Sequence, residues 1–282
     1  MKREGRLRRI RNIIGRSGMI ETTTEQINKI VAAIKSKKIY GNEAVWNFLI
    51  LSILSNSLLQ KDYFQLFCDA SIPMTSNYDI WFEGEPLSPR TKKRGYSEGN
   101  TKLDIAFGSI QKRPKTACGI KYNQHNEDSW ICFVEGKFFS DSSSGITHDS
   151  DKNQITRVIE NLLCFQGEDM FPKKLYFTLL TPKNYLNNLD RDYCRKFEEY
   201  KNHENILRDI ESSRIPKRMK KDWKYPDNLE ERVKLLTINW LTYEMIIEKE
   251  FNIPELNIIN LKNDHQNDLK LNKILNDLAN GL

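Results

Sequence analysis

The chain has 282 residues, 39% of them hydrophobic, so it can bury a core and global disorder is excluded. Lys and Arg number 44 against 38 Asp and Glu, and the net charge of +6 favours a polyanionic partner only weakly. The charge is uneven, because the segment from Tyr225 onward carries −4 and residues 1–224 carry +10. No signal sequence, membrane-spanning stretch, zinc motif or disulfide framework is evident, which favours a soluble, cytoplasmic protein without membrane partners.

The N-terminal part of the chain is expected to be helical. Apolar residues at helical spacing predict a helix over residues 25–37, at the end of a basic N-terminal arm. A second, more apolar pattern predicts a central helix over residues 43–59, although Asn47 interrupts it. A short strand is expected over residues 78–82, and the basic, Gly-, Pro- and Ser-containing segment 83–99 is expected to be a loop.

The middle of the chain reads as strands and one helix. Residues 103–110 and 130–139 are apolar and rich in β-branched or aromatic side chains, so they predict two strands. The polar, basic segment 111–129 joins them, which is consistent with antiparallel neighbours. A helix is expected over residues 153–165 and a further strand over residues 175–180.

The C-terminal part is less clearly patterned. Residues 185–214 are highly charged and are expected to be helical. Residues 233–247 are ambiguous: residues 233–238 could form a strand and residues 241–250 a helix. A weak helix is expected near the end of the chain. The order of elements predicts an α/β protein in which a helical arm (1–40) and a helical C-terminal extension (183–282) pack on a core (41–182), together forming one compact domain.

Three charged residues stand out against apolar surroundings. Glu135 and Lys137 lie on one face of the predicted strand 130–139, and Val134 and Gly136 lie on the other. A carboxylate and an ammonium are costly to bury unless they are paired or used. If the two predicted strands pair, Asp104 converges with them at one end of the sheet. Two carboxylates there could hold Mg²⁺, and Lys137 could orient a water and compensate charge. The alternative is that Asp104 lies in a turn at the start of its strand and that Glu135 and Lys137 form an ion pair on the surface.

The motifs resemble those of the PD-(D/E)XK, or restriction-endonuclease-like, nucleases. The resemblance rests on Leu103-Asp104, on Glu135-Gly136-Lys137 and on a helix that opens Asn153-Gln154-Ile155-Thr156-Arg157. It covers about half of the chain, residues 42–182, and departs from the usual pattern in having Leu103 where Pro is common. It implies a restriction-endonuclease-like α/β fold, with a mixed central sheet flanked by helices and with N- and C-terminal helical additions. It also implies hydrolysis of phosphodiester bonds with Mg²⁺, for which Mn²⁺ could substitute.

The resemblance also implies roles for individual residues. Asp104 and Glu135 match the metal-binding acids, and Lys137 matches the catalytic lysine. Members of the superfamily often add an acid from an earlier helix, and Glu43 is the candidate here. Complementing the helix N-terminus is an equally good explanation for Glu43.

Two residues of the predicted helix 153–165 complete the proposed site. Gln154 and Arg157, spaced three apart on one edge of that helix, are expected to contact the substrate phosphate or to hold Glu135 and Lys137. A capping box with Asp151 would also explain Gln154.

Basic clusters near the proposed site suggest a nucleic-acid partner. Each Lys or Arg contact to a phosphate adds salt-dependent affinity, although solvated loops are an equally simple explanation. The candidate contacts are Arg90, Lys92, Lys93, Arg94, Lys112, Arg113, Lys115, Arg218, Lys220 and Lys221.

The sequence therefore predicts a Mg²⁺-dependent nuclease that acts on DNA rather than RNA. The resemblance to this superfamily suggests a role in restriction or phage defence. A homodimer or a partner protein of a defence system is compatible with that role. The alternative is a non-catalytic nucleic-acid-binding module inside a larger complex.

Overall fold

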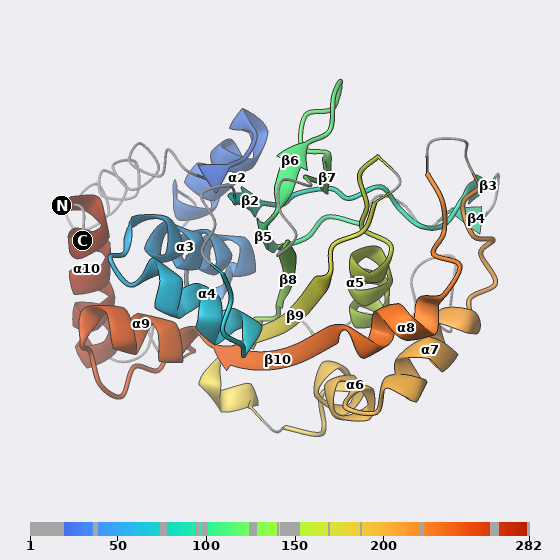
Figure 1. Cartoon of the computed structure of the whole chain (residues 1–282). Coiled ribbons are helices and arrows are strands. Elements are labelled where there is room, and N and C mark those ends of the chain that lie inside the picture. Colours follow the sequence, from blue (N-terminus) through green and yellow to red (C-terminus); the bar gives the residue numbers. More distant parts are fainter. Residues whose placement is uncertain are drawn as a thin grey trace.

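A mixed sheet of six strands forms the centre of the protein (Figure 1). This computed structural model describes residues 20–35, 39–73, 78–93, 96–97, 101–123, 129–139, 141, 153–168, 170–186, 188–219, 223–259 and 265–280. In spatial order the strands are β1 (Ile20–Glu21), β2 (Asp79–Phe82), β5 (Ile105–Gly108), β8 (Trp130–Gly136), β9 (Lys174–Thr181) and β10 (Leu236–Thr242).

One strand of the sheet runs against the others. β5 is antiparallel to both β2 and β8, whereas β1 with β2, β8 with β9, and β9 with β10 are parallel pairs. The start of β5 and the end of β8 therefore lie at the same edge of the sheet, with Ile105 opposite Val134. Two short hairpins lie outside the sheet, β3 (Lys92–Lys93) with β4 (Tyr96–Ser97), and β6 (Ile110–Lys112) with β7 (Ile120–Tyr122).

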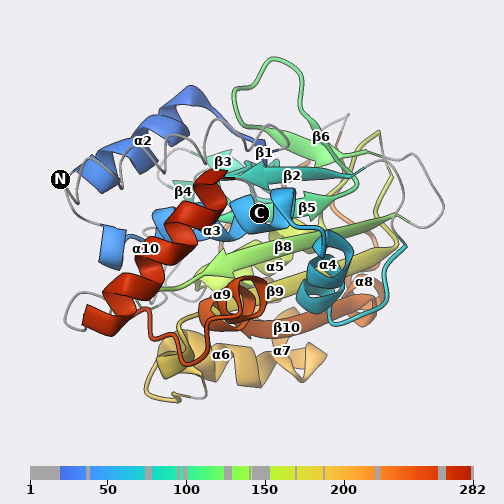
Figure 2. The ribbon, with the colours of Figure 1, turned by 90° about the vertical axis from the view of Figure 1, so that its left-hand side faces the viewer.

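Helices cover one face of the sheet around an apolar core (Figure 2). They are α2 (Thr24–Lys35), η1 (Ile39–Gly41), α3 (Glu43–Asn56), α4 (Gln60–Cys68), α9 (Tyr243–Phe251) and α10 (His265–Asn280). Ten of the fourteen residues of α3 are buried, because the sheet and other helices surround it. The central helix predicted over residues 43–59 is thus confirmed, although it ends at Asn56 and a separate helix, α4, follows.

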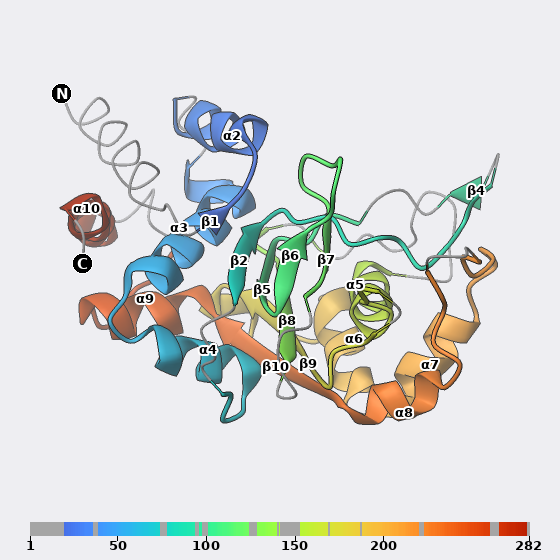
Figure 3. The same ribbon diagram turned by 45° about the horizontal axis from the view of Figure 1, so that its top comes forward.

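The opposite face carries a second core (Figure 3). Its helices are α5 (Gln154–Leu163), η2 (Lys183–Tyr185), α6 (Asp192–Tyr200), α7 (His203–Glu211) and α8 (Leu229–Lys234). The α5 helix connects the parallel strands β8 and β9, the crossover arrangement that parallel neighbours require. The predicted α/β class with a mixed sheet between helices is confirmed. Within the described residues, no helix is long and apolar enough to cross a membrane.

The C-terminal part differs from the helical extension that we expected. β10 pairs with β9 along its whole length, so residues after 182 complete the central sheet. The ambiguous segment 233–247 resolves into the end of α8, then β10, then α9. That last boundary is set by Thr242, whose hydroxyl accepts a hydrogen bond from the Met245 amide as an N-cap. Likewise β1 joins the sheet from within the predicted arm, whereas residues 1–19 of that arm lie outside the described part.

Candidate active site

Two acidic residues meet at one edge of the sheet because β5 and β8 are antiparallel. Asp104 directly precedes β5, and Glu135 is the penultimate residue of β8. The Gly136 amide, the next along β8, donates a hydrogen bond of 2.7 Å to Asp104 Oδ2. The strand pairing that we expected therefore places the Asp104 carboxylate against the Glu135-Gly136-Lys137 segment.

Lys137 joins Glu135 to the helix on the second face. Its ammonium lies 2.8 Å from Glu135 Oε1 and donates a 2.9 Å hydrogen bond to Gln154 Oε1 at the first turn of α5. Both charged side chains are buried, with exposed fractions of 0% for Glu135 and 3% for Lys137. Glu135 Oε2 is buried too and has no hydrogen-bond partner among the described residues. The predicted contact between Gln154 and the Glu135–Lys137 pair is thus present.

Glu43 approaches the same segment from the other face of the sheet. It is the first residue of α3, and its Oε2 accepts a 2.8 Å hydrogen bond from the Phe138 amide. Glu43 is therefore placed to complement the N-terminus of α3, and it lies beside the end of the Glu135–Lys137 segment. Its role as a further metal-binding acid stays a prediction.

Two of the groups at this site, Asp104 and Lys137, have shifted pKa values. Burial, together with the charges of Glu135 and Glu43, raises the pKa of Asp104 well above its ordinary value. Burial lowers the pKa of Lys137, but Glu135, Glu43 and Asp104 together outweigh burial and hold that pKa above its ordinary value. The Lys137 ammonium therefore stays charged beside these carboxylates.

Two further polar side chains, which our sequence analysis did not assign to the site, pack behind Gly136. Tyr243 at the start of α9 donates a 2.7 Å hydrogen bond to Asn47 Oδ1 of α3, and both residues are fully buried. The sequence marks Asn47 as unusual, because it is a polar residue within an apolar helix. Nothing in the sequence around Tyr243 indicates that it lies near the site. Their closeness explains why the residue between Glu135 and Lys137 is glycine.

Gly136→Ala should therefore destabilise the protein. A Cβ at Gly136 would lie 2.5 Å from Asn47 Oδ1 and 2.8 Å from the Tyr243 hydroxyl, neither of which has free space. We expect a loss of about 1–3 kcal/mol in the free energy of unfolding, the usual cost of overpacking, measured by urea denaturation.

Gly41→Ala is the matched control. A Cβ there would be 3.0 Å from the ring of Phe139, a side chain exposed enough to move. Its effect should stay within about 0.5 kcal/mol. Equal losses at both glycines would contradict the close packing behind Gly136.

The N-terminus of α5 and the contacts of Arg157 match the predictions only in part. The N-cap of α5 is Asn153, whose side chain accepts from the Thr156 amide, and Asp151 lies outside the described residues. Arg157 is one turn beyond Gln154, but it makes no ion pair with any described acid, and its buried Nε has no partner there. The Arg157 guanidinium thus keeps hydrogen-bonding capacity.

Two of the basic residues predicted to bind nucleic acid are instead buried, which corrects that prediction. Arg90 is 3% exposed, lies 2.6 Å from Glu160, and donates to the carbonyls of Ile210 and Ile215. Arg218 is 8% exposed and donates to the Ser88 carbonyl. Both guanidinium groups hold the chain together and are not available to phosphates.

The other basic candidates divide into three groups. Lys112 and Lys115 are exposed on the β6–β7 hairpin, and Arg113 beside them is half-buried. For Lys92 and Lys93 the structure describes only the backbone, in β3. Outside the described residues lie Arg94, Lys220 and Lys221.

Comparison of the chain with protein-family models, with curated proteins and with solved structures finds no match. The function is therefore inferred from the geometry of the site. In the described part of the chain, no three or more His, Cys, Asp or Glu side chains form a group that could hold a metal ion as it stands.

Proposed function

We propose that the protein is a Mg²⁺-dependent nuclease of restriction-endonuclease-like fold that hydrolyses phosphodiester bonds of DNA. The observation that carries the proposal is the buried Glu135–Lys137 pair beside Asp104 at one edge of a mixed sheet. Burying the Glu135–Lys137 pair next to a third, partly buried acid is costly, and a structural pair alone would not need the third. A site that binds a charged substrate would account for this arrangement of charges.

The side chains present suit a divalent cation held by few protein ligands. Glu135 Oε2 is buried without a hydrogen-bond partner among the described residues, and burial together with the charges of Glu135 and Glu43 raises the pKa of Asp104. Asp104 and Glu135 would hold the ion, with Glu43 close by. Mg²⁺ commonly uses one or two carboxylates and keeps several waters, so a group of three protein ligands is not required. Bound there, Mg²⁺ would supply neutralisation of charge on the scissile phosphate and on the leaving oxygen.

The protein's own side chains would orient the reacting groups. The Lys137 ammonium, fixed by Glu135 and Gln154, can donate a hydrogen bond to an attacking water or to a non-bridging phosphate oxygen. Arg157, which has no acidic partner among the described residues, can contact the adjacent phosphate. The exposed lysines Lys112 and Lys115 can add contacts to the backbone of the nucleic acid, which would weaken with salt.

The test is cleavage of plasmid DNA, single-stranded DNA and RNA by the purified protein with Mg²⁺, with Mn²⁺ or with EDTA. We expect cleavage of DNA with either cation, none with EDTA, and loss of cleavage in Glu135→Gln. RNA should be cut more slowly than DNA. Salt-sensitive binding of DNA without cleavage under any condition would contradict the nuclease and would indicate a non-catalytic binding module.

A further inference from the structure

Phe139, two residues after Lys137, carries an exposed aromatic ring beside the candidate active site. Among the residues whose side chains the structure describes, it is the only exposed aromatic residue, with an exposed fraction of 46%. Its neighbour Phe138 is buried and stacks on Trp46 at a ring distance of 5.8 Å. Two residues of extended chain span at most about 7 Å, which is the axial rise of two nucleotides. The ring can therefore reach a base next to a phosphate held at Lys137.

The ring of Phe139 lies past the edge of the sheet, where the two helical layers meet. Strand β8 ends at Gly136, and the rings of Phe139 and Phe138 then meet edge-on, with centroids 4.9 Å apart. A Cβ at Gly41, just before α3, would lie 3.0 Å from the Phe139 ring. On the other side, the Phe139 carbonyl accepts a 2.9 Å hydrogen bond from Arg191 at the start of α6. These contacts position Phe139 and still leave nearly half of its side chain open to solvent.

Arg191 supplies a cation at the same place. Its guanidinium lies over the ring of Tyr185, 4.1 Å from the centroid, and one of its nitrogens donates to the Phe139 carbonyl. The side chain is half-buried, and it forms no ion pair with any described acid. The carboxylate of Asp141 accepts hydrogen bonds from the first two amides of α6. The Arg191 guanidinium therefore keeps donors that a phosphate can accept.

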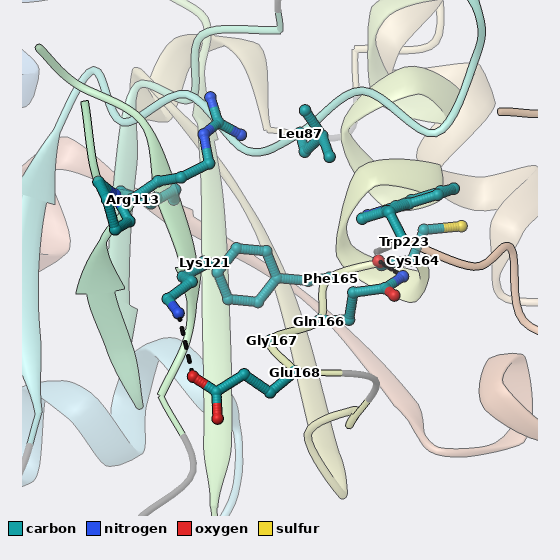
Figure 4. A pocket seen from close by; sticks show the side chains of 11 residues that line it. Leu87, Arg113, Lys121, Cys164, Phe165, Gln166, Gly167, Glu168 and Trp223 are labelled. Carbon is teal, nitrogen blue, oxygen red and sulfur yellow. Dashed lines mark hydrogen bonds and ion pairs between the residues drawn. The ribbon is translucent and has the colours of Figure 1, made fainter. Parts of the chain in front are cut away.

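A second aromatic surface beside a basic residue is closed to a base. Trp223 and Phe165 line a cavity of about 370 Å³ next to the β6–β7 hairpin, together with Lys121 (Figure 4). The two rings are only 4% and 3% exposed, and Lys121 pairs with Glu168. A base needs open ring surface to stack, which Phe139 offers and this cavity does not.

An exposed aromatic ring and a guanidinium side by side suit one nucleotide of a single strand, because the ring stacks on the base and the guanidinium contacts the phosphate. A base inside a duplex is already stacked and paired, and freeing it costs energy. We propose that Phe139 stacks on an unpaired base next to the scissile phosphate and that Arg191 binds a neighbouring phosphate. The preferred substrate is then single-stranded or locally unpaired DNA. This substrate preference rests on the proposed nuclease function, because it places the nucleotide beside Glu135 and Lys137.

The first test is the affinity for a short single-stranded oligonucleotide in EDTA, where cleavage cannot interfere, measured by fluorescence anisotropy. Phe139→Leu should weaken this binding at least about fivefold, the lower end of base–aromatic stacking, and should leave binding of a duplex of the same sequence unchanged. Phe139→Trp keeps an aromatic ring and should bind the strand at least as well as the wild type. The matched control is Leu58→Ala, which removes a fully exposed apolar side chain beyond the far end of α3 and should bind as the wild type does.

Arg191→Gln should weaken binding of the strand about tenfold, the typical loss of a charge-assisted hydrogen bond. It should also lower the slope of log affinity against log salt by about 0.7, the value for one phosphate contact on a single strand. The control Arg208→Gln removes the same charge from the exposed surface of α7 and should change neither quantity.

Cleavage with Mg²⁺ separates the stacking role from the nuclease itself. The wild type should cut single-stranded DNA faster than linear duplex of the same sequence, and Phe139→Leu should remove most of that difference. Unchanged strand binding in Phe139→Leu, or equal losses with strand and duplex, would overturn the stacking role even in a protein that cuts DNA. Weakened strand binding in Phe139→Leu of a protein that cuts no DNA would overturn the nuclease and retain the stacked base.

Discussion

Replacing Lys137 with methionine should lower the rate of DNA cleavage about 10²–10⁴-fold, the usual loss when a positioned donor or proton-transfer group is removed from an active site. Methionine is nearly as long as lysine, but it cannot donate to water or to phosphate oxygen, and like Arg90→Met it removes the cation beside a buried carboxylate, here Glu135. The Lys137 ammonium is also the one cation paired with Glu135 among the described residues. The rate of nicking of supercoiled plasmid with Mg²⁺ measures the effect.

The matched control for that variant is Lys201→Met. Lys201 is 60% exposed and pairs with Glu198 at the end of α6, away from the β5–β8 edge. Its rate should stay within about twofold of the wild type, because exposed pairs contribute little. Near-ultraviolet circular dichroism of Lys137→Met should match the wild type and so separate lost chemistry from lost fold. A folded Lys137→Met protein with wild-type rate would remove Lys137 from the site.

Replacing Arg90 with methionine should reduce the free energy of unfolding by about 3–5 kcal/mol, because it removes the cation that lies 2.6 Å from the buried Glu160 carboxylate. Tyr225 would still donate its 2.9 Å hydrogen bond to Glu160, which cannot neutralise a charge. The two carbonyls of α7 and the following turn would also lose their donors. Urea denaturation at pH 7 measures the loss.

The sign of a pH effect on that variant follows from the same pair. An unpaired buried carboxylate has a raised pKa in the folded state, so it is protonated as the pH falls and its cost disappears. The deficit of Arg90→Met against the wild type should therefore shrink from pH 7 toward pH 4. Replacing both partners, as Arg90→Met with Glu160→Leu, should recover part of the loss.

A surface arginine is the control for this stability prediction. Arg208→Met removes a side chain that is 63% exposed and pairs with Asp209 at the edge of α7. It should cost no more than about 1 kcal/mol. A loss at Arg90 no larger than at Arg208 would contradict a structural role for the Arg90–Glu160 pair.

Local patterns in the sequence were sufficient to predict the edge where the acids meet. The alternation along β8 places Glu135 and Lys137 on the α5 face and Gly136 on the α3 face, as period 2 requires. Asp104 was expected within a strand, and it lies one residue before β5, where a bend still directs it to Gly136. These positions depend on neighbours in the chain and on one strand pairing.

The features that the sequence did not predict depend on contacts between residues far apart in the chain. Arg90 stands in a polar, basic segment, which is typical of a solvated loop, but its acid is on a helix 70 residues later. Strand β10 is likewise defined by its pairing with β9, because its own residues suit either a strand or a helix. Tyr243 reaches Gly136 only because α9 packs on α3. Burial of a charged or polar side chain is set by such tertiary contacts.

The most direct measurement of the central claim is the ratio of cleavage rates of wild type and Glu135→Gln on the same DNA, with Mg²⁺ and at equal protein concentration. This substitution keeps the size of the side chain and removes the charge beside Lys137. We expect the wild type to cut at least about 100-fold faster, and EDTA to abolish that difference. Equal rates in the two folded proteins, or cleavage that persists in EDTA, would contradict a nuclease site built on Asp104, Glu135 and Lys137.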